Sequence, residues 1–184
     1  MKLFLIATLT ILLASCGYMG NSALDYNNSL VKKQYEVSED MNAFMDFIKI
    51  SRMDSITDID SYKTELNSLR DKALSNIKEC KGEIKEVGSF KDDANFQQSL
   101  LNVMELYHQG INYDYYQMGA YYLLPKEEQT TEKYNEIVNL VLSMDSKVET
   151  AELNFIEEQK KLGVQLLQFN PVTRKLAWIN HRQK

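Results

Sequence analysis

The sequence predicts an all-α protein built from four long helices. Prolines, which interrupt helices, are rare: the chain contains only Pro125 and Pro171. Alternating runs of β-branched residues bounded by turn residues, which are typical of strands, are absent. Apolar residues instead recur every three or four positions over long stretches, which places them on one face of a helix. None of these helices can bury its apolar stripe alone, so we expect them to pack against each other.

The first helix is expected over residues 23–53. Its apolar stripe consists of Leu24, Val31, Tyr35, Met41, Met45 and Ile48, flanked by Leu30, Val37, Phe44 and Phe47. The second helix is expected over residues 58–87. Thr57 or Asp58 suits its N-cap, and Gly88 stands where a glycine commonly ends a helix. Its stripe consists of Ile59, Tyr62, Leu66, Leu69, Ala73, Ile77, Cys80, Ile84 and Val87.

A third helix is expected over residues 92–123, where Ser89 with Asp92 resembles a helix start signal. Gly110 and Gly119 lie in its interior, and each costs about 1 kcal/mol relative to alanine. We therefore expect close helix approach or a local kink near these glycines. The stripe of this helix consists of Phe96, Leu100, Val103, Tyr107, Ile111, Tyr115, Met118 and Tyr122.

A fourth helix is expected over residues 126–169, with Pro125 near its first turn and Asn170-Pro171 at its end. Its heptad pattern consists of Tyr134, Ile137, Val141, Met144, Val148, Ala151, Phe155, Leu162, Leu166 and Phe169. Short connections make sequential helices antiparallel neighbours. We therefore predict an up-down-up-down four-helix bundle over residues 23–170. Two helical hairpins that dimerise would bury the same stripes, and we favour the closed monomer.

The N-terminus is typical of a secretory signal peptide. Lys2 is followed by an apolar run over residues 3–13, which is too short to span a membrane. The segment Leu13-Ala14-Ser15-Cys16 resembles the lipobox of bacterial lipoproteins, in which the chain is cut before the cysteine and the thiol is acylated. The resemblance implies a signal peptide over residues 1–15, a lipidated Cys16, and a short tether over residues 16–22.

The charge distribution argues against a nucleic-acid partner. The net charge is −5, and removal of the segment that carries Lys2 leaves −6. Four basic residues lie beyond residue 170, so the body of the chain carries −10, which does not suit contacts to phosphate backbones. The basic tail over residues 171–184 contains Trp178. This tail could touch lipid headgroups, but we favour its folding back onto the acidic body.

Residues with catalytic or metal-binding patterns are scarce. Glu105 and His108 have the Glu-x-x-His spacing of di-iron bundles, but the second motif that such a site needs is missing. We therefore expect no metal, no other cofactor and no catalysis. Cys80 has no partner once Cys16 is acylated, and we interpret it as a small buried hydrophobe.

Tyrosines crowd the end of the third helix. Tyr115 and Tyr122 fall on the core stripe, whereas Tyr113, Tyr116 and Tyr121 spread towards its flanks, where some hydroxyls should reach the surface. Because tyrosines are enriched at interfaces, these three are candidates for contact with a protein partner. Wide helix packing is the simpler interpretation of the same residues. An aromatic pocket for a small ligand, lined by Tyr107, Tyr115 and Met118, is an alternative.

The lipobox, the tether, the Asp25-Tyr26-Asn27-Asn28-Ser29 opening and the all-helical length together resemble a family of uncharacterised bacterial surface lipoproteins of Bacteroidetes and spirochaete type. The resemblance implies a helical bundle with no assigned activity. Gly17, where inner-membrane lipoproteins carry Asp, favours the outer membrane. Residues 17–21 hold no acid, which favours the periplasmic face, although the family resemblance favours the surface. We expect a lipid-anchored binding or scaffolding module.

Overall fold

The computed structural model describes residues 23–53, 56–90 and 94–162. They form α2 (Ala23–Met53), α3 (Ile59–Val87), α4 (Asn95–Gln109), the π-helical turn η2 (Gly110–Asp114), α5 (Tyr115–Tyr121), the 3-10 turn η3 (Lys126–Glu128) and α6 (Thr131–Lys161). The predicted signal peptide (1–15), the tether with Cys16 (16–22) and the basic tail (171–184) lie outside the described residues.

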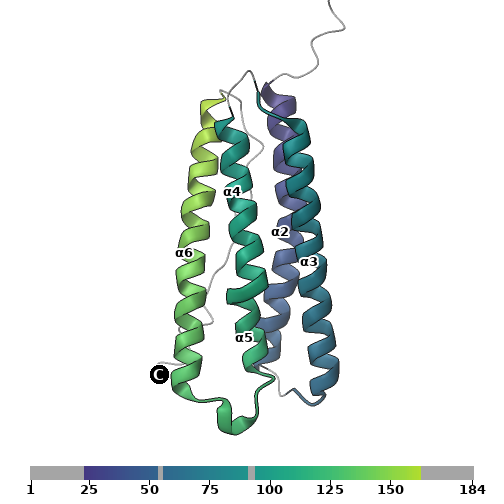
Figure 1. Ribbon diagram of the computed structural model, residues 1–184, viewed down its shortest axis with the longest axis vertical. Coiled ribbons are helices and arrows are strands. Elements are labelled where there is room, and N and C mark those ends of the chain that lie inside the picture. Colours follow the sequence, from purple (N-terminus) through teal and green to yellow (C-terminus); the bar gives the residue numbers. More distant parts are fainter. Residues whose placement is uncertain (1–22, 54–55, 91–93, 163–184) are drawn as a thin grey trace, which may run out of the picture.

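The predicted all-α class is confirmed, since the described residues are helical and contain no strand. Four helical segments pack side by side along the long axis of the molecule: α2, α3, α4 with α5, and α6 (Figure 1). The closest packing joins α2 to α3 and α4 to α6, whereas α3 touches α4 less extensively. Among the described helices, none is long and apolar enough to cross a membrane.

The stripe of α3 agrees best with its prediction. Its buried residues are Tyr62, Leu66, Ala73, Ile77, Cys80 and Ile84. Asp58 caps the first turn by accepting a hydrogen bond from the Ser61 amide at 2.9 Å, and Gly88 follows the last turn with φ 74°. Ile59 and Val87 were expected in the stripe, but both are exposed, because they are the first and last residues of the helix.

The stripe of α2 differs from its prediction. Leu24 and Tyr35 were expected in the core but are 42% and 47% exposed. The buried face combines half of the expected stripe with three of the residues expected to flank it, and it includes polar side chains. Its buried members are Tyr26, Asn27, Leu30, Val31, Gln34, Val37, Ser38, Met41, Phe44 and Ile48. A search for apolar spacing alone mis-centres this helix because Asn27 and Gln34 occupy core positions.

The third helical segment begins later and is less regular than predicted. The helix α4 starts at Asn95, after Ala94, which makes no side-chain cap. A π-helical turn at Gly110 then separates α4 from α5. The expected close helix approach is present at both glycines. A β-carbon at Gly119 would lie 2.6 Å from Leu66 Cδ1 of α3. One at Gly110 would lie 3.3 Å from Met144 Cγ of α6 and 2.5 Å from Tyr115 Cε2 in the same helical segment.

The fourth helix begins five residues later than predicted. Pro125 precedes the 3-10 turn η3 instead of the first turn of the long helix. The long helix α6 starts at Thr131, because the Thr130 side chain accepts a hydrogen bond from the Lys133 amide at 3.2 Å and so caps it. Its expected continuation to residue 169 lies outside the described residues beyond Leu162.

Candidate functional site

The three tyrosines predicted to contact a partner have different environments. Tyr113 is 60% exposed. Tyr116 is half-buried against α3: its hydroxyl donates to Asn67 Oδ1 at 3.0 Å, and the guanidinium of Arg70 lies 4.6 Å from its ring centroid. The expected exposure of Tyr121 is wrong, because this residue is buried.

The burial of Tyr121 follows from the way the chain turns after α5. Its hydroxyl donates to the Thr130 carbonyl at 3.3 Å, and its ring centroid lies 5.6 Å from that of Tyr134. The start of α6 therefore covers it. Tyr122, expected on the core stripe, is only partly buried. Of the predicted patch, Tyr113 and the edge of Tyr116 are what a partner could reach.

The residues proposed for an aromatic pocket are packed in the core. Tyr107, Tyr115 and Met118 are each at most 2% exposed. The Tyr107 hydroxyl donates to Glu152, and the Tyr115 hydroxyl donates to Asp145 Oδ1 at 2.7 Å. Neither of the two grooves described below includes any of these three residues.

Glu105 and His108 do not form part of a metal site in the described part of the chain. Over these residues, no group of three or more histidine, cysteine, aspartate or glutamate side chains is placed to hold an ion. Glu105 instead accepts a hydrogen bond from the Lys81 ammonium across the gap between α3 and α4. This contact lies at the edge of a groove that Lys81 and His108 line.

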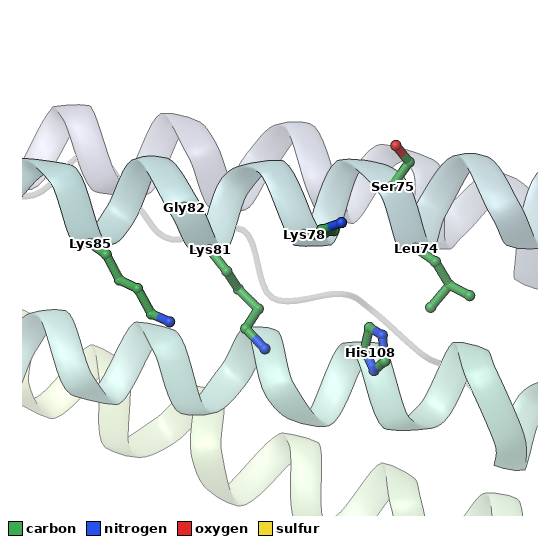
Figure 2. A pocket seen from close by; sticks show the side chains of 7 residues that line it. All are labelled: Leu74, Ser75, Lys78, Lys81, Gly82, Lys85 and His108. Carbon is green, nitrogen blue, oxygen red and sulfur yellow. The ribbon is translucent and has the colours of Figure 1, made fainter.

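A cationic groove of about 440 Å³ runs between α3 and α4. Its lining consists of Leu74, Ser75, Lys78, Lys81, Gly82, Lys85 and His108, and we call it the cationic groove (Figure 2). Its volume is within the range of small-molecule sites. Figure 2 shows Leu74, Lys81 and Lys85 extending from α3 towards α4, and His108 extending from α4 towards α3.

Helical periodicity explains why these cations converge. Positions 74, 78, 81 and 85 are separated by four, three and four residues, which places them on one face of α3. Like charges at these spacings repel each other, so the arrangement slightly destabilises the helix unless an anion is present. The looser packing of α3 on α4 leaves room between the two helices for such an anion.

One carboxylate already lies at the edge of the cationic groove. The hydrogen bond from Lys81, and after it the charges of Lys81, His108 and Lys85, hold the pKa of Glu105 below its ordinary value. Within the described residues, neither Lys78 nor Lys85 forms an ion pair. Two ammonium groups of the groove are therefore outside any ion pair among the described residues, in a protein whose overall charge is −5.

Gly82 leaves the centre of the groove wall bare. A β-carbon at this position would meet no atom within 4 Å. The open space beside the helix backbone and the apolar side chain of Leu74 give the groove a non-polar surface between its charges. An organic anion with an apolar portion matches this combination better than a bare inorganic ion does.

A second groove, of about 340 Å³, lies between α4 and α6 and differs in chemistry. Its lining is carboxamide-rich and consists of Asn95, Gln98, Ser99, Asn102, Asn154 and Glu158. Its carboxylate, Glu158, already accepts a hydrogen bond from Lys161. Its lining among the described residues includes no cation, so these residues offer no comparable electrostatic attraction.

The sequence contains a local signal for the cationic groove. It lies in the order of the lysines and glutamates along the second helix. When they are sorted by helical position, Lys78, Lys81 and Lys85 share one face, and Glu79, Glu83 and Glu86 lie on another.

Comparison with protein families, curated protein sequences and solved structures found no match for this chain.

Proposed function

We propose that this chain is a lipid-anchored bacterial envelope protein that acts as a non-catalytic binding module and takes an organic anion in the cationic groove. The observation that carries the proposal is the convergence of Lys78, Lys81, Lys85 and His108 on one cavity of an acidic protein. Clustered cations concentrate anions locally and raise their rate of association.

The anchor rests on the sequence around Cys16. A charged start, a short apolar run and Leu-Ala-Ser before the cysteine support cleavage and acylation at this position. Intact-mass analysis of the protein from its native membranes tests this directly. An acylated chain beginning at Cys16 supports the anchor, and an unmodified Cys16 rejects it. We place the protein at the outer membrane, on its periplasmic face.

The helices are proposed to alternate in direction, as an up-down-up-down bundle. Two observations support this topology: the connections between consecutive helices are short, and the colour order in Figure 1 runs back and forth along the long axis. This order puts α3 beside α4, which is the pairing that forms the cationic groove.

Calorimetric titration with small aromatic anions tests the binding function. Benzoate, benzenesulfonate and phenyl phosphate share a phenyl ring and differ in their charged group. We expect at least one to bind, and the double variant Lys78→Gln/Lys85→Gln to lose that binding. The matched control, Lys49→Gln/Lys63→Gln, removes the same charge from exposed positions outside the groove. Absence of binding by all three anions, or equal loss in both double variants, refutes the proposal.

A protein partner is the second candidate function. The 60% exposure of Tyr113 within the π-helical turn η2 favours it, because tyrosines are enriched at interfaces and π-helical turns frequently occur at functional sites. Crosslinking in native membranes tests it. A partner captured by the wild-type protein but not by Tyr113→Ala supports this candidate, and equal capture by both proteins refutes it.

A further inference from the structure

We infer that the cationic groove takes a phosphate monoester and that Glu105 acts as an internal anion competing for the same cations. The inference rests on the anion-binding function proposed above and deepens it. It makes two separate claims: one about the charge of the ligand, and one about a residue that sets the affinity.

The charge of the ligand follows from the charges in the groove. The Glu105 carboxylate neutralises the Lys81 ammonium, while Lys78 and Lys85 have no carboxylate partner among the described residues. Two ammonium groups that form no ion pair match a dianion. A phosphate monoester carries about −1.5 to −2 at neutral pH, whereas a carboxylate or a sulfonate carries a single charge. Of these three groups, the phosphate monoester is therefore the best match.

The geometry also suits a tetrahedral anion with several acceptor oxygens. Lys81 and Lys85 approach from α3, and His108 approaches from α4, so donors come from both walls (Figure 2). Each lysine offers three N–H donors and acts as a point charge, which places few demands on ligand orientation. The bare backbone at Gly82 and the side chain of Leu74 leave space for the organic part of the ester.

Glu105 satisfies the conditions for a reversible competitor. Its side chain is 61% exposed, so its carboxylate can leave Lys81 for water at small cost. The Lys81 side chain is 27% exposed and lies deeper in the groove. A ligand phosphate that approaches Lys81 therefore displaces an anion that is already bound there. Removing the Glu105 charge should leave a third ammonium group for the ligand.

The experiment extends the same calorimetric titrations of the full chain. We expect the wild-type protein to bind phenyl phosphate about tenfold more tightly than benzenesulfonate or benzoate, because each additional charge interacts with both free ammonium groups. Glu105→Gln should tighten phenyl phosphate binding by about a further tenfold. The control Glu127→Gln makes the same change in net charge in η3, at an exposed residue outside the groove, and should change the affinity by less than about twofold.

Failure of the inference can be told apart from failure of the proposed function. If the three anions bind with equal affinity, or if Glu105→Gln and Glu127→Gln have equal effects, the inference is overturned and anion binding stands. If none of them binds, the function itself fails.

Vesicles identify the source of the phosphate group. Cys16→Ser protein is mixed with phosphatidylcholine vesicles that either contain or lack phosphatidate, whose headgroup is a phosphate monoester. Binding to phosphatidate vesicles that phenyl phosphate reverses indicates a lipid ligand. Binding of phenyl phosphate alone indicates a soluble ester, and both results support the inferred chemistry.

Discussion

Two glycines in helix interiors should respond differently to substitution by alanine. Gly119 in α5 faces the core, and a β-carbon there would lie 2.6 Å from Leu66 Cδ1 and 3.3 Å from Ile48 Cγ1. Gly82 in α3 faces the cationic groove, and a β-carbon there would meet nothing within 4 Å. The prediction is that Gly119→Ala destabilises the protein relative to Gly82→Ala.

The magnitude follows from two terms. Alanine is favoured over glycine in a helix interior by about 0.8–1.0 kcal/mol, and this gain applies at both positions. At Gly119 a carbon contact of 2.6 Å is far inside the ordinary separation of about 3.5–4.0 Å. Leu66 is fully buried and cannot move without disturbing its neighbours, so overpacking should cost about 1–3 kcal/mol. The helix term cancels in the comparison, and the difference between the two variants equals the overpacking cost.

Urea unfolding followed by circular dichroism measures this difference. We expect Gly82→Ala to raise the midpoint above that of the wild type, and Gly119→Ala to fall below Gly82→Ala by about 1–3 kcal/mol in the free energy of unfolding. Both slopes should match that of the wild type, because neither substitution changes the area exposed on unfolding. If Gly119→Ala is as stable as Gly82→Ala, the close approach of α5 to α3 is wrong.

Three further predictions concern single side chains. Burial raises the pKa of the Cys80 thiol to about 12. In Cys16→Ser protein, a thiol reagent at pH 8 should therefore label Cys80 only after the protein is unfolded. Rapid labelling of the native protein would contradict the burial of Cys80. Burial raises the pKa of Asp114, so the native state binds this proton more tightly than the unfolded state does, and the contribution of Asp114 to stability falls as the pH rises from its ordinary pKa through the raised one. Asp114→Asn should therefore stabilise the protein at pH 7, with the gain shrinking towards pH 4 in urea titrations. A gain independent of pH would refute this. Asp58→Ala removes the cap of α3 and should lower the free energy of unfolding by about 0.5–2 kcal/mol by the same measurement, whereas an unchanged midpoint would show that the cap contributes nothing.

The sequence predicted the fold class and the ends of α3 because each depends on local signals. Apolar spacing, the Asp58 cap and Gly88 all act within a turn or two of the chain, so they can be identified without knowing the packing. The start of α6 also has a local signal, since Thr130 is a good N-cap, but the predicted helix began directly after Pro125. Both residues favour helix starts, but Pro125 begins the short 3-10 turn η3, and the long helix begins only after Thr130.

The π-helical turn and the cationic groove depend on packing between helices and could not be located in the same way. Interior glycines predicted an irregularity near Gly110, and the close contact with Tyr115 accounts for a glycine at this position. The lysines of α3 could be placed on one face from the sequence. Their convergence with His108 depends on which helix lies opposite, and that is a property of the assembled bundle.

The polar residues that mis-centred the prediction of α2 also explain how the chain selects one arrangement of its helices. Asn27 and Gln159 are fully buried, and the Gln159 side-chain amide donates to Asn27 Oδ1 at 2.8 Å, which connects α2 directly to α6. An arrangement that separated these helices would leave both amides buried without this bond, at a cost of about 1–3 kcal/mol for each unsatisfied group. Apolar stripes alone would tolerate many pairings, including hairpins that dimerise. The Asn27–Gln159 bond penalises pairings within one chain that leave α2 and α6 apart, and it therefore favours arrangements in which these two helices are neighbours.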